Sequence, residues 1–143
     1  MATGYDFDFE GPRPIPDVRT LVNSAIDTGG AAPFINYEGE WRSWRWLRNY
    51  RQALDQHAAS IGMEPGHAVA LVARNHPDHV AAMAAQTAGG RLTSMVYSAQ
   101  SASRIAAEVE QAAAPLVLAS KQDWTPELFG IVERQGGLGL ALA

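Results

Sequence analysis

Residues 68–120, AVALVARNHPDHVAAMAAQTAGGRLTSMVYSAQSASRIAAEVEQAAAPLVLAS, decide the fold. Three short apolar runs, 68–73, 92–97 and 116–120, alternate with two longer segments that have a helical pattern. The first run is continuously apolar, which is typical of a strand that is buried on both faces. The alternation of strand and helix, with short loops, predicts an α/β fold with a parallel sheet and right-handed crossovers.

Helix-start signals support this pattern. Asn75 can cap a helix that has Pro77 at its first position and that ends before Gly89-Gly90. Ser101 or Ser103 can cap the next helix, which ends near residue 113. Both segments between the apolar runs are therefore predicted to be helices.

The flanking sequence extends this unit on both sides. Apolar spacing predicts helices over 17–28, 43–61 and 125–134, and a small hairpin of strands 34–37 and 41–43. Proline and glycine exclude a long helix before residue 17. We therefore divide the chain into an extended N-terminal arm (1–16), an α/β unit (17–135) and an apolar Gly/Leu/Ala tail (136–143).

Composition excludes several classes of function. The 143 residues carry a net charge of −4 and contain no cysteine, so a disulfide scaffold, a thiol nucleophile and a thiolate metal site are excluded. A net acidic chain lacks the basic face that nucleic acids need, so we expect no nucleic-acid partner. Lys121 is the only lysine, which limits lysine-dependent chemistry to one position.

Targeting signals are not evident. No apolar run reaches the roughly 18 residues that span a bilayer, so we expect no membrane span. The first ten residues carry Asp6, Asp8 and Glu10, whereas a secretory signal begins with positive charge. The expected compartment is the cytoplasm.

Motifs that carry chemistry are few. Arginine and aromatic residues interleave over Trp41–Arg51, but helical spacing predicts that the aromatics face inward and the arginines face solvent. His76 and His79 could share a metal, yet no third ligand is indicated, and a surface loop position for His76 is the favoured interpretation. The glycines of 136–139 lack the third glycine of a dinucleotide fingerprint, and no G-x-x-x-x-G-K-[ST] or G-x-S-x-G motif is present. The residues alone indicate no catalytic residue and no metal site.

The order of several short motifs resembles the N-terminal region of AMP-forming acyl-CoA synthetases. The matching pieces cover about residues 17–124 and are Ser43-Trp-Arg-Trp-Leu47, Pro65-Gly66-His67-Ala68-Val69-Ala70-Leu71, Arg74-Asn75-His76-Pro77-Asp78-His79-Val80, Ala88-Gly89-Gly90, Arg104-Ile105 and Ala113–Ala119. The resemblance implies the fold of the N-terminal domain of an adenylate-forming enzyme. It implies a ligase of fatty acid metabolism that activates an acid as its acyl-adenylate and transfers it to coenzyme A.

Several motifs of the same family are missing from this sequence. The family's Thr-Ser-Gly-Thr-Thr-Gly-x-Pro-Lys-Gly phosphate loop, its Tyr-Gly-x-Thr-Glu and Thr-Gly-Asp motifs and its C-terminal lysine are not in the sequence. ATP, Mg and coenzyme A are thus implied for a complete enzyme, with none bound by this part alone. We expect a truncated or split subunit, inactive by itself, whose partner is the remaining portion of the ligase or a complementary chain.

Tyr97, Ser98 and Ala99 are the candidate substrate-binding residues. They follow the run 92–97, and ligands of parallel sheets bind at the carboxyl ends of strands. By the resemblance they stand where the family often has Asn-Pro-Arg, whose arginine can hold a coenzyme A phosphate in some members. No arginine stands at these three positions, so the resemblance implies no such contact here.

Two other functions stay open. The same fold could serve as a non-catalytic interaction module, which would be well dispersed alone, whereas a fragment would expose apolar sheet and self-associate. A flavodoxin-like small-molecule binder would use the crevice near Arg74-Asn75 and Tyr97-Ser98. The missing glycine-rich loop after the first parallel strand counts against the binder.

Overall fold

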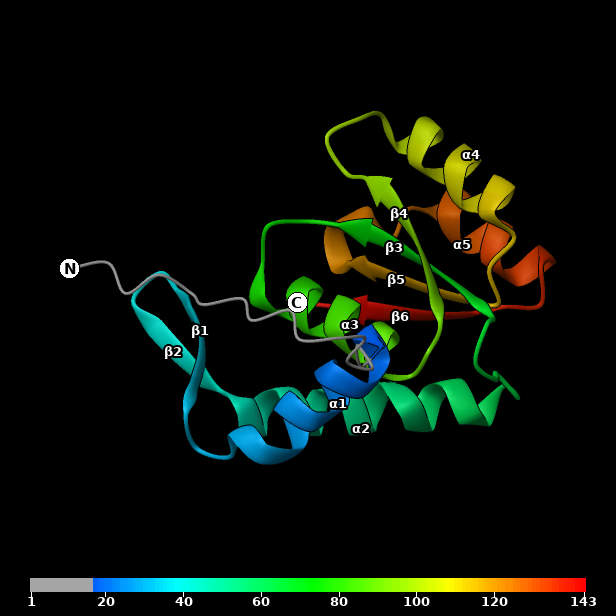
Figure 1. Cartoon of the computed structure of the whole chain (residues 1–143). Helices are drawn as coiled ribbons and strands as arrows, with labels where there is room; N and C mark the ends of the chain where they lie inside the picture. Colours follow the sequence, from blue (N-terminus) through cyan, green and yellow to red (C-terminus); the bar gives the residue numbers. More distant parts are fainter. Residues whose placement is uncertain (1–16) are drawn as a thin grey trace, which may run out of the picture.

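A four-stranded parallel sheet forms the centre of the molecule, in the order β4-β3-β5-β6 (Figure 1). The computed structural model describes residues 17–143, so the expected arm, 1–16, lies outside the described residues. The strands are β3 (Ala68–Ala73), β4 (Leu92–Tyr97), β5 (Leu116–Ser120) and β6 (Leu138–Leu142). The connections contain α3 (Pro77–Ala88), α4 (Ala102–Ala112), the 3-10 turn η1 (Lys121–Asp123) and α5 (Pro126–Arg134). The predicted α/β fold with a parallel sheet is confirmed.

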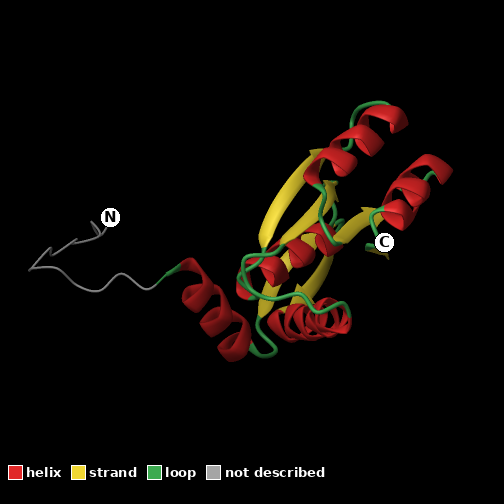
Figure 2. Cartoon of the chain, turned by 90° about the vertical axis from the view of Figure 1, so that its right-hand side faces the viewer, coloured by secondary structure: helices red, strands yellow, loops and turns green. Residues whose placement is uncertain are grey.

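Helices cover both faces of the central strands, and Figure 2 shows the sheet between the two groups. On one face α4 and α5 pack on residues of β3 and β5 such as Val72 and Val117. On the other face α3 and α2 (Trp44–Ser60) pack on Leu71 and Leu118. Because β3 and β5 are covered on both faces, their continuously apolar sequences are explained.

The N-terminal elements build a third core. Helix α1 (Val18–Gly29) packs through Ile26 against Leu47 of α2 and Ala81 of α3. A hairpin of β1 (Pro33–Tyr37) and β2 (Glu40–Ser43) joins α1 to α2, as the sequence predicts.

Side chains cap both of these helices. Ser43 accepts from Trp46 N at 3.2 Å at the start of α2. The Asp17 carboxylate accepts from Thr20 N at 2.7 Å, and this hydrogen bond holds the pKa of Asp17 below its usual value.

The C-terminal segment differs from the sequence expectation. Residues 136–143 were expected to form a tail, but 138–142 form β6, which pairs in parallel with β5. Gly139 allows this pairing because a Cβ there would overlap the indole ring of Trp124. That indole donates to Leu140 O at 3.3 Å. Gly139 therefore allows the Trp124 ring to lie close to the backbone of β6, and this contact explains the glycine without a bound ligand.

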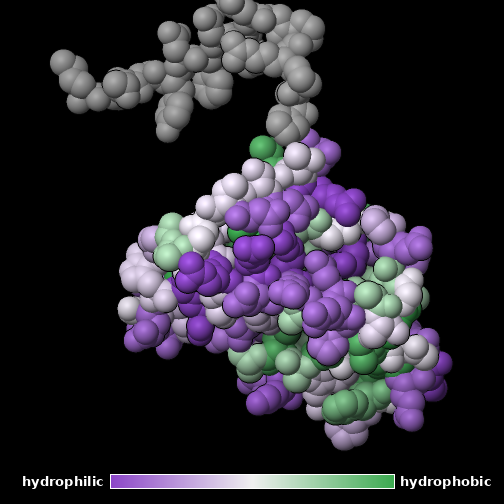
Figure 3. Space-filling model, turned by 90° about the horizontal axis from the view of Figure 1, so that it is seen from below, coloured by the Kyte–Doolittle hydropathy of each residue, from purple (hydrophilic) through white to green (hydrophobic). Residues whose placement is uncertain are grey.

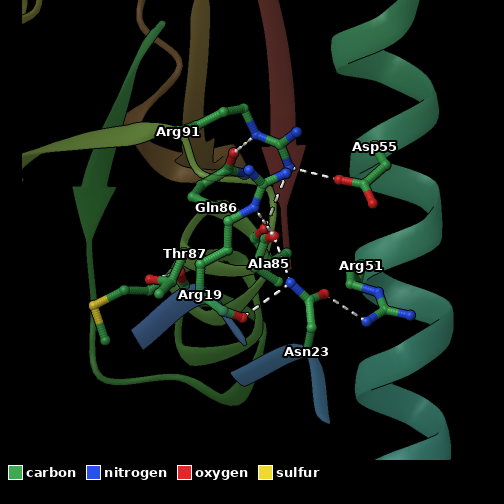
Figure 4. Close-up of polar contacts among 10 residues, drawn as sticks. Arg19, Asn23, Arg51, Asp55, Ala85, Gln86, Thr87 and Arg91 are labelled. Atoms are coloured by element: carbon green, nitrogen blue, oxygen red, sulfur yellow. Dashed lines mark hydrogen bonds and ion pairs between the residues drawn. The ribbon is translucent and has the colours of Figure 1, made fainter. Parts of the chain in front are cut away.

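A polar network fixes the C-terminal end of α3 to α1 and α2 (Figure 4). Asn23 of α1 donates to Ala88 O at 2.8 Å, and Arg51 of α2 donates to Asn23 Oδ1 at 2.9 Å. Arg91 lies between the helices, where it pairs with Asp55 at 2.7 Å and also donates to Gln86 Oε1. Cations at a helix C-terminus complement its negative dipole, so this arrangement is structural.

The surface that α1 and α2 form is mostly hydrophilic (Figure 3). Two arginines of the Trp41–Arg51 stretch are engaged with neighbouring side chains. Arg42 of β2 lies 5.0 Å from the centre of the Trp46 ring, and Arg51 of α2 pairs with Asp27 of α1 at 2.6 Å. Within residues 17–143, none of the helices combines the length and the apolar character that crossing a membrane requires.

Candidate binding site at the carboxyl edge of the sheet

The strand order creates a switch point between β3 and β5. These strands are neighbours, yet the helix after β3 packs on one face of the sheet and the helix after β5 packs on the other. Loops that leave adjacent strands in opposite directions open a crevice at their carboxyl ends, where ligands of such sheets bind. The candidate site is therefore the group of polar side chains that follows β3 and β5.

An ion pair bridges this crevice. Arg74 follows β3, and Asp123 ends η1 after β5. The guanidinium donates through Nε to Oδ2 at 2.7 Å and through Nη2 to Oδ1 at 2.6 Å, while the carboxylate side chain is only 5% exposed. These hydrogen bonds raise the pKa of Arg74 above its usual value. A bidentate ion pair of this kind holds the loop after β3 and the loop after β5 together.

A buried histidine lies behind the ion pair. His79 of α3 accepts from the backbone N–H of Arg74 at Nδ1, at 3.2 Å, and its Nε2 is 2.8 Å from Ser120 Oγ. Since a backbone amide can only donate, Nδ1 carries no proton and Nε2 donates to Ser120. Burial, reinforced by the neighbouring His76, lowers the pKa of His79, which therefore stays neutral near pH 7.

The Ser120–His79 pair is oriented against nucleophilic catalysis. A serine nucleophile needs an unprotonated imidazole nitrogen facing its hydroxyl, and it needs a carboxylate on the other nitrogen. Here the proton faces Ser120 and a backbone amide occupies the other nitrogen. The pair joins α3 to β5 and supplies no general base.

His76 closes the outer side of the cluster. Its ring caps α3 by accepting from Asp78 N at 3.2 Å, so the cap is His76 and not the expected Asn75. The ring of Tyr37, at the end of β1, lies edge-on at 5.2 Å. The hairpin thereby reaches the carboxyl edge of the sheet, which the sequence pattern did not indicate.

A metal does not fit these side chains. Both ring nitrogens of His79 are engaged, so this ring cannot share an ion with His76. Within residues 17–143 no three His, Asp or Glu side chains are placed to hold a metal.

The phosphates of ATP do not fit either. The loop Arg74-Asn75-His76 contains no glycine, its arginine is neutralised by Asp123, and Asp78 puts negative charge on the first turn of α3. A phosphate site needs free backbone amides and unpaired cations, whereas here the amides of Arg74 and His76 are engaged and the arginine is paired.

Tyr97, Ser98 and Ala99 lie one strand away from this cluster. Tyr97 ends β4, is 70% exposed and pairs in the ladder with Ala73. The side chains of Tyr97 and Ser98 take part in no hydrogen bond or ion pair found within residues 17–143. The role of Tyr97, Ser98 and Ala99 in binding a substrate stays a prediction.

Sequence reasoning missed Ser120, Asp123 and the burial of His79. The position of Ser120 at the end of the apolar run 116–120 is a signal of the same kind as the one that selected Tyr97. Asp123 gives no such signal, because its partner Arg74 is 49 residues away in the sequence.

Comparison with known proteins finds relatives by structure alone. No protein-family model and no curated protein sequence matches this chain. Among solved structures, a benzoate CoA ligase from Burkholderia xenovorans LB400 matches 90% of the chain with a TM-score of 0.74 at 11% identity. An anthranilate CoA ligase in complex with anthranoyl-AMP matches 92% with a TM-score of 0.73 at 9% identity. The O-succinylbenzoate coenzyme A synthetase from Bacillus subtilis matches 84% with a TM-score of 0.67 at 13% identity.

The matched part is a minor share of each of these proteins. It amounts to 26% of the benzoate and anthranilate ligases and 24% of the O-succinylbenzoate enzyme. The described residues thus correspond to a portion of a larger domain. The chain has the fold of the N-terminal domain of adenylate-forming enzymes, and it corresponds to a fragment of that domain.

Proposed function

We propose that this chain forms the N-terminal part of an ATP-dependent ligase that joins a carboxylic acid to coenzyme A. In such a reaction the acid attacks the α-phosphate of ATP and releases pyrophosphate, and the thiol of coenzyme A then displaces AMP. The structural similarity to CoA ligases and the ordered motifs of residues 17–124 support this proposal. The fold by itself does not select an activity, because activity depends on the groups of the site.

The observation that carries the proposal is the closed crevice between β3 and β5. In a small-molecule binder this crevice would receive the ligand, whereas here Arg74 and Asp123 fill it. The chain therefore contributes sheet and helices, and the groups that neutralise the phosphates of ATP belong to residues beyond these 143. By itself the chain is inactive in this proposal.

Tyr97, Ser98 and Ala99 are the proposed acid-contacting residues. Their position at the carboxyl end of the edge strand leaves them free to meet a further part of the ligase. The acid is a fatty or related carboxylic acid, and the compartment is the cytoplasm. Replacing Tyr97 by alanine in the assembled enzyme should change the preference among acids, measured as relative kcat/KM. Unchanged preference would remove these residues from the site.

Acid-dependent ATP–pyrophosphate exchange tests the activity. The native protein is immunopurified from its own cells, and exchange is measured with a panel of fatty and aromatic acids beside the isolated 143-residue chain. The proposal expects exchange by the native material, which should contain peptides of a phosphate loop, and none by the isolated chain. Native material without exchange and without such peptides would contradict it.

A non-catalytic interaction module is the second candidate. It is favoured by the double-sided cover of β3 and β5, since a chain with closed cores can be stable alone. Size-exclusion chromatography of the isolated chain distinguishes the two candidate functions. The module predicts a well-dispersed monomer or homodimer, and the ligase fragment predicts self-association through exposed apolar sheet.

A further inference from the structure

The outer edge of β6 is open within residues 17–143, because this strand pairs only with β5. Leu138 N–H donates to Pro115 O at 2.9 Å, which fixes the backbone groups that face β5. In a parallel ladder alternate residues direct both groups to the same neighbour, so the N–H and C=O of Gly139 and Ala141 point outward. Both residues are exposed, and their small side chains leave this edge accessible to another strand.

The surface beside this edge is uncharged. Strand β6 itself has no charged residue, no proline and no bulge in its pairing with β5, features that keep many edge strands from pairing further. A groove of about 170 Å³ lies between β6 and α2, and its α2 side chains include Tyr50, Ala53 and His57. No Asp, Glu, Lys or Arg lines this groove, so a charged partner gains nothing from it, whereas a second copy brings the same uncharged surface.

The sequence of β6 is self-complementary about Leu140. A two-fold axis at this residue puts Leu140 opposite its own copy, and Gly139 opposite Ala141 of the second copy. Gly139 and Ala141 are the outward-facing residues, so each such pair exchanges both N–H···O hydrogen bonds of an antiparallel ladder. A shift by one residue would oppose outward and inward groups. A shift by two would leave Gly139 or Ala141 without a partner inside the strand.

We propose that β6 pairs antiparallel with β6 of a second copy of this chain. The two sheets then join into one, with α2 of both chains on the same face, because the two-fold axis is perpendicular to the sheet. Leu138 lies opposite Leu142 of the second copy, so leucines also pack across the junction. A stable interface buries roughly 1,000 Å² or more, so the groove residues Tyr50 and His57 belong to the proposed contact.

The pairing rests on the proposed function, because a ligase fragment is expected to self-associate through exposed apolar sheet. The joined sheet still exposes Leu92 and Met95 of β4 at each end. Pairing through β6 is therefore one contact of this self-association and does not by itself make a well-dispersed homodimer. Its failure is distinct from failure of the proposed function, which would appear as absent ATP–pyrophosphate exchange by the native material.

Cysteine substitutions in the full chain test the register, since the chain has no cysteine of its own. Leu140→Cys should form a disulfide between chains on mild oxidation at least tenfold faster than Met83→Cys, which lies at an exposed position of α3. Leu138→Cys and Leu142→Cys should each cross-link slowly alone, and at least tenfold faster when the two variants are mixed. Non-reducing gels measure these rates.

Two outcomes of the cross-linking would overturn the proposal. Equal rates for Leu140→Cys and Met83→Cys would mean that β6 has no preferred contact with its copy. No acceleration on mixing Leu138→Cys with Leu142→Cys would mean that another register or another surface joins the chains.

Amide hydrogen exchange of the unsubstituted chain gives a readout that does not depend on the folding of a variant. The amides of Gly139 and Ala141 should exchange at least tenfold more slowly at millimolar than at low micromolar chain concentration. The Leu140 amide faces β5, so it is the internal control and should change less. Exchange of Gly139 and Ala141 that does not depend on concentration would contradict pairing with a second copy.

Discussion

The two ends of helix α3 carry the same kind of ion pair with opposite burial. At the N-terminal end, the carboxylate of Asp123 is buried at 5% side-chain exposure and Arg74 is 33% exposed. At the C-terminal end, the guanidinium of Arg91 is buried at 7% and Asp55 is 44% exposed. The difference matters because removal of the arginine leaves an unpaired buried charge only where the carboxylate is the buried partner.

Their surroundings differ accordingly. Arg91 also donates to Ala85 O at 3.3 Å, at the end of the helix where carbonyl groups favour a cation. The buried carboxylate of Asp123 pairs with Arg74, which follows another strand. The C-terminal network fastens three helices together, and the N-terminal cluster fastens two loops across a crevice.

The largest effect is expected from Arg74→Met. It leaves Asp123 buried without its cation, which costs about 3–5 kcal/mol of unfolding free energy at pH 7. Urea unfolding measures it, and Arg74→Met with Asp123→Leu should recover most of the loss. A loss below about 1 kcal/mol in the single variant would mean that the ion pair does not hold the crevice closed.

A smaller loss is expected from Arg91→Met at the other end. It removes hydrogen bonds to Gln86 and Ala85 O, but Asp55 regains water, so we expect about 2–3 kcal/mol. The matched control is Arg104→Met, since Arg104 is 70% exposed and its surface pair contributes about 0.5 kcal/mol or less. If Arg91→Met costs more than Arg74→Met, the contrast between the two ends is wrong.

The smallest effect is a dependence of stability on pH that arises at the N-terminal end alone. The folded protein lowers the pKa of His79 below 6.5, so the unfolded chain binds more protons once the pH falls below that value. Unfolding free energy should therefore be retained above pH 6.5 and decline as the pH falls through the window beneath it. His79→Gln should reduce this decline in urea titrations at pH 7.5, 6.5 and 5.5. An equal decline in both proteins would assign it to other groups.

The sequence predicts most of the fold because each element has a local signal. Apolar runs, caps and glycine stops define the helices and strands from α1 to α5 within a residue or two, but they do not indicate the 3-10 turn η1. Strand β6 is not predicted, because Gly137 and Gly139 weaken the strand pattern of this segment. Both glycines lie close to residues that are distant in the sequence, Pro115 and Trp124, and local patterning does not reveal such contacts. The edge position of β4 among residues 17–143 is also not predicted, since an apolar run does not reveal whether a strand lies at an edge.

Only the part of the candidate site that directly follows a predicted strand could be predicted from the sequence. Arg74 lies directly after an apolar run and was included in the expected crevice. Its closure by Asp123 depends on a contact over 49 residues, and the burial of His79 depends on the contact with Ser120 over 41 residues. Neither follows from local patterning.

A titration of the isolated chain with Mg·ATP, followed by NMR of the ¹⁵N-labelled protein, tests the central claim most directly. The claim is that these residues contribute scaffold to a ligase and hold no nucleotide themselves. We predict no saturable shift of the Arg74 Nε–H or of the Ser120 and Asp123 amides up to millimolar Mg·ATP. Saturable shifts at these groups, abolished by Arg74→Met, would show a nucleotide site within the chain and would contradict the account.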